Sequence, residues 1–474
     1  MSALEQAAAV RRREVSPVEL VDHCLGRVDR LSDELGAFIT VTDEAARAQA
    51  KLAERAVTAG ARQGDAEGGE LPVLHGVPTA IKDLNLTAGV RTTFGSSVFA
   101  DLVPPVDDYL VTKLRAAGTI SLGKTNTPEL GLPCYTEPPV APVARCPWDT
   151  GRYSGGSSGG AATAVAAGLL PFAQGSDGGG SIRIPSSVCG LFGIKPTRGR
   201  VSAGPIRADV SGLAIDGPIA RTVRDAAAML DVLAGPMPGD MFTAVPLPAG
   251  ETYLAAADRE PGRLRIGRYL APSVAEVPVD PDVRAGWEAA SALLADLGHE
   301  IEDVPPLFPP ELLRPFEVLW SVGACSYPIE PAQEERLLPL TRYLRERGRS
   351  VSAAEYVQAR QSLQVAAWAG SAAMVGYDVL LAPVVSAPAR PIGWFRADGE
   401  GAPDFERQKQ FAPYCAVYNV TGHPAVSVPL HWTADGLPVG MMLVGRHHDE
   451  ATLISLSAQL EAATGWPDRH PPMW

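Results

Sequence analysis

The spacing of hydrophobic residues changes along the chain between the period of a helix and that of a strand. Apolar positions recur at helical spacing from Ala3 to Val57. A strand-like run follows from Leu74 to Ile81, then a helical stretch from Tyr109 to Ala117 and a second apolar run from Thr119 to Leu122. This alternation predicts an α/β protein whose first 60 residues form a helical N-terminal segment.

Two stretches rich in Gly and Ser interrupt this pattern. The first, from Pro133 to Gly160, has little periodicity and is predicted to be a long ordered loop. A helix of small residues from Ala161 to Leu170 and a short strand from Phe172 to Gln174 separate it from the second loop, Gly175 to Arg183. Because one helix and one strand can return the chain, we expect serines of the two loops to lie close together.

The second half of the chain is predicted to hold a variable, mostly helical insertion at about residues 305–405. Its helical pattern is flanked by prolines and contains Phe316, Trp320 and Tyr327. Aromatic residues at helical spacing are more often core than binding residues, so these three are not assigned to a site, although the insertion is expected to shape a pocket. An amphipathic helix from Ala451 to Ala463 closes the chain.

Composition narrows the class of protein. The 474 residues are 46% hydrophobic and 20% charged, as in an ordinary globular enzyme, and 54 acidic residues outnumber 41 basic ones. This negative excess argues against nucleic acid or an anionic membrane as a partner. The basic run Arg11-Arg12-Arg13 follows an alanine-rich stretch instead of preceding one, which is unlike a secretory signal, so a cytoplasmic protein is expected.

Neither a metal site nor a membrane span is predicted. The six cysteines are scattered, without the C-x-x-C or close Cys/His spacing of zinc sites. The longest weakly polar run, Val365 to Val385, contains Asp378 and reaches Pro383, so it lacks the roughly 20 apolar residues of a spanning helix. No cofactor is expected either, since the Gly/Ser loops lack the Lys-Ser/Thr ending of a P-loop.

The two Gly/Ser loops suggest serine chemistry. They read Gly155-Gly156-Ser157-Ser158-Gly159-Gly160 and Gly178-Gly179-Gly180-Ser181-Ile182-Arg183. A serine hydroxyl is a poor nucleophile until a base takes its proton, and no histidine occurs between His75 and His299. Lys82, which ends an apolar run, is the nearer candidate if burial lowers its pKa from about 10.4. From the residues alone, a solvated lysine and flexible linkers remain open as alternatives.

Longer motifs stand in a fixed order along the chain. They are Leu74-His75-Gly76-Val77-Pro78 with Lys82-Asp83, Gly123-Lys124-Thr125-Asn126-Thr127-Pro128-Glu129, the two Gly/Ser loops, Tyr418-Asn419-Val420-Thr421-Gly422-His423-Pro424-Ala425 and Asp435-Gly436-Leu437-Pro438-Val439-Gly440. Ser157 lies 75 residues after Lys82, and Ser181 lies 24 residues after Ser157. In these motifs and spacings the chain resembles the amidase signature family, and only the segment near 305–405 falls outside the resemblance.

The resemblance implies one α/β domain over residues 1–474, with a large mixed, twisted central sheet and helices on both faces. It also implies hydrolysis of the C–N bond of a small-molecule carboxylic amide. Ser181 would attack the carbonyl and form an acyl-enzyme, Ser157 would relay the proton, and Lys82 would receive it. Aryl and alkyl amides are the expected substrates, with esters and carbamates as side substrates, and the resemblance allows a homodimer.

Further site residues follow from the same resemblance. The expected oxyanion and substrate-binding positions are Gly178, Gly179, Gly180 and Gly131. Ser158 and Arg183 are expected to support the two loops. The family often has Thr or Ile where this chain has Gly178, but the backbone N–H group is unchanged. The family also has a cis peptide before the relay serine, which predicts one at Gly156-Ser157.

Alternative functions remain open. Gly155 to Gly159 also matches the G-x-S-x-G motif of α/β-hydrolases, in which Ser157 would be the nucleophile of an esterase and a late histidine such as His423 the base. That motif directly follows a strand, whereas Pro147 to Arg152 is predicted to be a loop. The family also includes an amidotransferase subunit that delivers ammonia to a partner, but the aromatic insertion and the stretch Cys134 to Pro138 look more like a free-standing amidase. A non-enzymatic binding protein is disfavoured because all three triad positions are filled.

Overall fold

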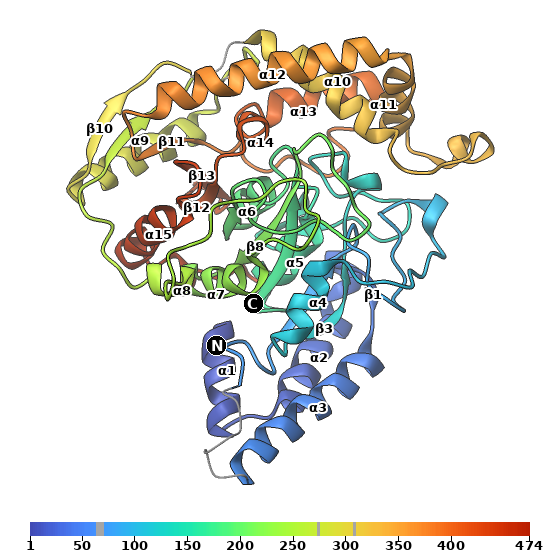
Figure 1. Ribbon diagram of the computed structural model, residues 1–474, viewed down its shortest axis with the longest axis vertical. Coiled ribbons are helices and arrows are strands. Elements are labelled where there is room, and N and C mark those ends of the chain that lie inside the picture. The colour runs from blue at the N-terminus through green and yellow to red at the C-terminus, as the bar shows by residue number, and fades with distance from the viewer. Residues whose placement is uncertain (63–70, 273–274, 307–309) are drawn as a thin grey trace.

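The centre of the molecule is an eight-stranded mixed sheet. The computed structural model describes residues 1–62, 71–272, 275–306 and 310–474, and Figure 1 shows the sheet between layers of helices. The strand order is β10-β9-β11-β13-β12-β7-β8-β6, in which the pairs of β9 are parallel and the others antiparallel. Their bounds are β6 (Phe172–Asp177), β7 (Phe192–Lys195), β8 (Ile215–Ala220), β9 (Arg265–Arg268), β10 (Glu300–Asp303), β11 (Val379–Pro383), β12 (Ala425–Trp432) and β13 (Pro438–Gly445).

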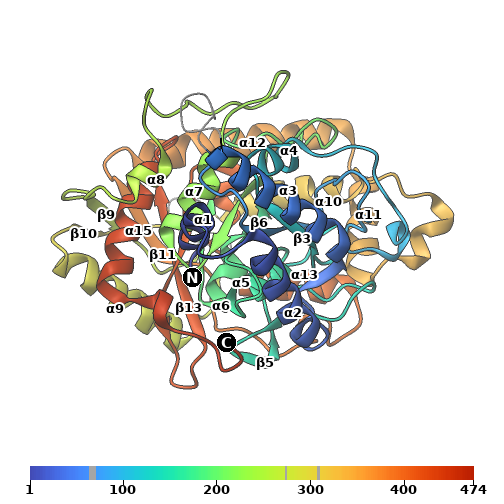
Figure 2. The same cartoon turned by 90° about the horizontal axis from the view of Figure 1, so that it is seen from below.

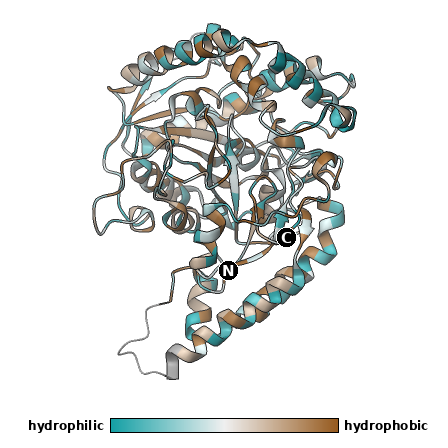
Figure 3. Cartoon of the chain, turned by 45° about the vertical axis from the view of Figure 1, so that its right-hand side comes forward, coloured by the Kyte–Doolittle hydropathy of each residue, from teal (hydrophilic) through white to brown (hydrophobic). Residues whose placement is uncertain are grey.

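Helices cover both faces of this sheet, as predicted, because alternate strand residues point to opposite sides. In β13, Met442 and Val444 join one core, whereas Met441 and Leu443 join the other. The first core is completed by α2 (Pro17–Leu35), α3 (Asp43–Arg62), α5 (Gly159–Ala166), α6 (Arg183–Cys189), α10 (Leu313–Ala324), α12 (Ala353–Met374), α13 (Gly401–Phe411) and α14 (Val417–Thr421). The second is completed by α1 (Ala3–Arg12), α4 (Tyr109–Ala116), α7 (Val223–Leu233), α8 (Tyr253–Ala256), α9 (Pro281–Asp296) and α15 (Glu450–Thr464). Figure 3 shows hydrophobic residues gathered in the strands and hydrophilic ones along the outer helices.

The N-terminal segment is helical with one exception. A strand, β1 (Phe38–Val41), lies between α2 and α3 and pairs with β3 (Ile120–Thr125), which also pairs with β2 (Pro78–Lys82). The strand predicted from Leu74 to Ile81 is β2, and it begins only at Pro78. Gly76 has a φ of +82°, which an extended backbone does not allow, so the strand cannot begin before it. Figure 2 views the molecule from the end where α1, α2 and α3 lie.

The small sheet meets the large one where β2 runs beside the edge strand β6. The backbone N–H of Lys82 donates to Gln174 Oε1 at 2.9 Å, and Thr79 Oγ1 donates to the carbonyl of Phe172 at 3.4 Å. The C-terminal end of β2 is thereby held beside Gln174 of β6. The Lys82 side chain consequently reaches Ser176, near the end of β6, where the chain leaves the sheet for the glycine run 178–180.

The first Gly/Ser loop contains a short hairpin that the sequence did not predict. Strands β4 (Arg145–Cys146) and β5 (Asp149–Tyr153) pair with each other, so the prediction of a loop from Pro147 to Arg152 is wrong. Their residues lack apolar alternation, and part of the pairing comes from far along the chain, since the Tyr153 N–H donates to the carbonyl of Arg390. Only the folded chain supplies this contact.

The segment at 305–405 is mostly helical, with residues 307–309 outside the described ranges. It includes α10, α11 (Pro339–Ser350) and α12, and α11 packs against α10 and α13. It also contributes β11, which is fully buried in the central sheet between β9 and β13. The segment is therefore not wholly peripheral. No helix in the described ranges is both long enough and apolar enough to cross a membrane.

Candidate active site

Lys82 lies at the end of β2 with its side chain fully buried among hydroxyl groups. Its Nζ is 2.8 Å from the Oγ atoms of Ser157 and Ser158 and 2.9 Å from Ser176 Oγ. The Ser176 carbonyl oxygen lies at 3.3 Å. The structure thus brings the predicted base and the predicted relay serine into direct contact.

The surroundings of Lys82 lower its pKa to about 7, chiefly because burial disfavours the ammonium form. The charges of Asp216 and Asp177 work in the opposite direction, and Arg207 lowers the pKa further. All the atoms that hydrogen-bond to Lys82 Nζ belong to uncharged groups. Lys82 can therefore lose its proton near neutral pH, as a general base must.

The two Gly/Ser loops meet through their backbones. The Ser158 N–H donates to the carbonyl of Ser181 at 3.2 Å, and the peptide between Gly156 and Ser157 is cis, as predicted. No hydrogen bond joins the Ser157 and Ser181 hydroxyls in the described part of the chain. Ser181 is 7% exposed and faces a pocket, whereas Ser157 is 2% exposed and lies behind it, next to Lys82.

A buried ion pair holds the second loop. Arg183 bonds to both carboxylate oxygens of Asp177 at 2.9 Å, and Asn419 donates to the carboxylate and to the Asp177 carbonyl. Burial alone would raise the pKa of Asp177, but the Arg183 guanidinium more than offsets this and holds it well below its usual range. These contacts tie Arg183 to the loop that carries Ser181.

The predicted oxyanion glycines differ in how their N–H groups are used. Gly180 donates to Asp177 Oδ1 at 2.7 Å, and Gly131 donates to the carbonyl of Pro128 at 2.9 Å. The N–H groups of Gly178, Gly179 and Ser181 have no acceptor among the described residues. Of the four predicted glycines, Gly178 and Gly179 therefore keep an N–H group free for a ligand, as does Ser181, whereas those of Gly180 and Gly131 are already bonded.

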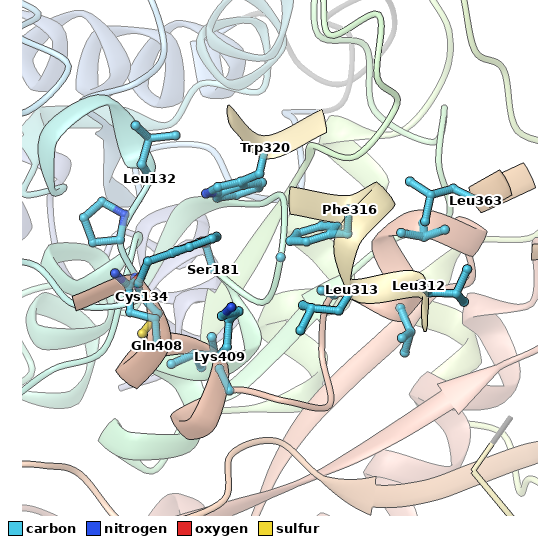
Figure 4. A pocket seen from close by; sticks show the side chains of 18 residues that line it. Leu132, Cys134, Ser181, Leu312, Leu313, Phe316, Trp320, Leu363, Gln408 and Lys409 are labelled. Atoms are coloured by element: carbon cyan, nitrogen blue, oxygen red, sulfur yellow. The ribbon is translucent and has the colours of Figure 1, made fainter. Parts of the chain in front are cut away.

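Ser181 opens onto a pocket of about 800 Å³, including the space open to solvent. Figure 4 shows Trp320 and Phe316 on one side, with Cys134, Gln408 and Lys409 opposite. The lining residues are mostly apolar: Leu132, Pro133, Cys134, Gly179, Ser181, Ile184, Leu312, Leu313, Phe316, Trp320, Leu363, Phe405, Gln408, Lys409, Ala412, Ala416, Val417 and Val420. Phe316 and Trp320, which sequence reasoning left unassigned, line the pocket, whereas Tyr327 packs against Phe94 and Phe99 instead.

Sequence reasoning gave no role to three polar residues of the site. Ser176 bonds to Lys82, Asp177 anchors the second loop, and Asn419 ties that loop to α14. Asp177 directly precedes the glycine run, and Asn419 lies inside one of the motifs shared with the family. Their positions in the sequence could therefore have marked both residues as candidates for the site. His423, the base in the esterase alternative, bonds to Thr421, and its ring lies against that of His447. The residue in contact with Ser157 is Lys82.

Comparison with known proteins agrees with the geometry. The model of the Amidase family matches residues 19–454. A putative amidase, AmiB2 of Mycobacterium tuberculosis, is 39% identical and covers 99% of this chain and 97% of its own. The structure of a 6-aminohexanoate cyclic dimer hydrolase superimposes with a TM-score of 0.90 at 32% identity, covering 100% of this chain and 99% of that one.

These matches run through residues 305–405, so the expectation that this segment falls outside the resemblance is wrong. The chain is also 33% identical to a glutamyl-tRNA(Gln) amidotransferase subunit of Geobacillus kaustophilus, and the match covers 99% of this chain and 98% of that protein. The family model spans most of the chain, and the relatives match over nearly their whole lengths. The chain therefore belongs to the amidase signature family of amide-hydrolysing enzymes.

Proposed function

We propose that this protein hydrolyses a carboxylic amide through an acyl-enzyme on Ser181. The observation that carries the proposal is the contact of 2.8 Å between Ser157 Oγ and a buried Lys82 whose pKa is lowered to about 7. A neutral amine in that position can accept a proton through Ser157. Ser181, on the adjacent loop, is the serine that faces the pocket.

In the first half of the proposed reaction, Ser181 Oγ attacks the carbonyl carbon and its proton moves to Ser157 Oγ, whose own proton passes to Lys82 Nζ. The tetrahedral oxyanion accepts hydrogen bonds from the free N–H groups of Gly178, Gly179 and Ser181. The proton returns through Ser157 to the amide nitrogen, and the amine leaves.

Water completes the reaction by the same relay. It loses a proton through Ser157 to Lys82 as it attacks the ester, and Ser181 recovers a proton as the acid leaves. Aryl and alkyl amides are the proposed substrates, with esters and carbamates as side substrates. All six cysteines are free thiols, as is usual in the reducing cytoplasm, which supports a cytoplasmic location. We also propose a homodimer, which analytical sedimentation can test.

The proposal is tested by amine release from anilides and alkyl amides, using the purified chain without partners. Ser181→Ala and Lys82→Ala should each abolish turnover. The matched control is Ser186→Ala, which removes a buried α6 hydroxyl that has no hydrogen-bond partner among the described residues and should leave turnover intact. Turnover that survives Ser181→Ala would contradict the mechanism, and an inert wild-type chain would favour an amidotransferase subunit.

A further inference from the structure

The pocket beside Ser181 offers a substrate few polar side chains. Apart from Ser181 and a cysteine, the described lining residues with polar side-chain atoms are Gln408, Lys409 and Trp320, whose indole N–H can only donate a hydrogen bond. The Gln408 amide is already used at both ends, since its Oε1 accepts from the Cys134 N–H at 2.9 Å and its Nε2 donates to Asp404 Oδ1 at 2.6 Å. Lys409 is therefore the side chain that decides the charge of the pocket.

Lys409 is neutralised by two carboxylates. Its Nζ lies 2.6 Å from Glu317 Oε1 and 2.5 Å from Glu406 Oε1, and the lysine side chain is 14% exposed. Glu317 in addition accepts from Arg347 at 2.9 Å. The ammonium group has no unmatched charge to offer a carboxylate on a substrate. Among the described residues, no carboxylate lines the pocket for a substrate ammonium.

An aromatic pair forms the opposite wall. The rings of Phe316 and Trp320 stack with centroids 5.5 Å apart on α10. A Cβ atom built on Gly178 would meet the Trp320 ring at 3.4 Å, and one on Gly179 would meet both rings at 3.7 Å. The pair therefore packs directly on the loop that leads to Ser181, where it can hold the apolar part of a bound amide next to the reacting carbonyl.

We infer that this pocket selects amides whose buried group is uncharged and apolar, with Phe316 and Trp320 as specificity-determining residues and Lys409 as a masked cation. This inference rests on the proposed function, because it takes Ser181 as the reacting residue. Burying a charged group without a partner is far more costly than burying a methyl group. Free amino-acid amides such as glutamine, which carry both an ammonium and a carboxylate group, are therefore poor substrates.

Three amides of equal length test the charge selection: hexanamide, 6-aminohexanamide and adipic monoamide, which end in a methyl, an ammonium and a carboxylate group. We expect kcat/KM for hexanamide to exceed that of either charged amide by at least about 100-fold. Equal values would overturn the inference. The same ranking is expected for binding of the three amides to the Ser181→Ala variant, measured by saturation-transfer NMR, which reads the pocket without the reaction.

Unmasking Lys409 gives a gain-of-function test. In the double variant Glu317→Gln with Glu406→Gln, the freed ammonium should raise the ratio of kcat/KM for adipic monoamide to that for hexanamide by about tenfold or more. The matched control, Glu335→Gln with Glu346→Gln, makes the same charge change at exposed positions that are not among the described partners of Lys409 and should not change this ratio. A ratio that stays the same in both variants would contradict the masked cation.

The aromatic wall is tested by Trp320→Ala, with Trp368→Ala as control because Trp368 is 66% exposed on α12 and does not line the pocket. Trp320→Ala should lower kcat/KM for hexanamide by about tenfold more than for acetamide, which is too short to cover the ring. Equal losses on both amides would rule out a specificity role. Turnover that survives Ser181→Ala would instead refute the proposed function, so the two failures are distinguishable.

Discussion

Two buried lysines near the ends of the neighbouring strands β2 and β3 differ in their surroundings, and this difference distinguishes a proposed chemical role from a structural one. Lys82 ends β2 and Lys124 lies near the end of β3, where Ile81 is opposite Lys124 in the register of the two strands. Both side chains are fully buried. Lys82 is surrounded by hydroxyl groups, whereas Lys124 lies 3.5 Å from the carboxylate of Asp83.

Burial lowers the pKa of both lysines, but their neighbours give them different roles. The pKa of Lys82 falls to about 7 and that of Lys124 to about 8, the latter raised in part by the Asp83 carboxylate. A lowered pKa alone therefore does not mark a catalytic base in this fold. The distinguishing feature of Lys82 is its contact with the hydroxyl of Ser157, whose loop bonds through its backbone to Ser181, the serine that faces the pocket.

The largest expected effect is that of Lys82→Met on catalysis. Removing a general base typically costs about 10²- to 10⁴-fold, so kcat for amide hydrolysis should fall by that factor. Because burying the lysine amine is itself unfavourable, the variant should unfold at the same temperature as wild type or higher. Steady-state kinetics and thermal denaturation check both points, and a loss of less than tenfold in kcat would remove the distinction between the two lysines.

Lys124→Met should act on stability instead. It leaves the buried carboxylate of Asp83 without its counter-ion, and breaking one side of a buried pair typically costs about 3–5 kcal/mol. Urea denaturation measures the loss. Adding Asp83→Asn to this variant should restore part of the lost free energy of unfolding. If Lys124→Met lowers that free energy by less than about 1 kcal/mol, the ion pair contributes little to stability.

The pH dependence of catalysis sharpens the comparison further. The base works without its proton, so kcat/KM should rise with pH through about 7 and then level off, falling roughly tenfold per pH unit on the acid side. Arg207 lowers the pKa of Lys82 and bonds to Asp216, which raises it. Arg207→Gln should therefore move the midpoint to higher pH, and a profile independent of pH between 5.5 and 8 would exclude Lys82 as the base.

The sequence predicted those parts of the fold that depend on local pattern. Strand β6 with the loop after it, helix α5 and the position of Lys82 at a strand end all follow from short-range hydrophobic spacing and glycine content. The resemblance added the proposed roles of Lys82, Ser157 and Ser181. Strand β1 was missed because only four extended residues lie between two long helices, and β5 was missed because its pairing depends on Arg390.

The pocket could not be predicted from local pattern. Its walls come from α10, α12, the neighbouring helices α13 and α14, and loop residues near Leu132 and Gly179. These segments are mostly far apart in sequence, and only their packing brings Phe316 and Trp320 to the pocket of Ser181. Helical spacing identifies a buried side of a helix but not whether that side meets core or cavity. For Lys409 the sequence shows only one partner, Glu406, three residues before it, because the other, Glu317, is 92 residues away.

The smallest expected effect concerns Ser158, which touches Lys82 without belonging to the relay. Its hydroxyl donates to the Ser176 carbonyl at 3.2 Å and so accepts from Lys82, which favours the protonated lysine. Ser158→Ala should therefore move the midpoint of the pH profile to lower pH and reduce kcat by up to about tenfold, the worth of one buried hydrogen bond. Measuring kcat/KM across pH separates this positioning effect from a purely structural one, because a structural defect would lower the plateau without moving the midpoint. An upward shift would mean that Ser158 donates to a neutral Lys82 instead.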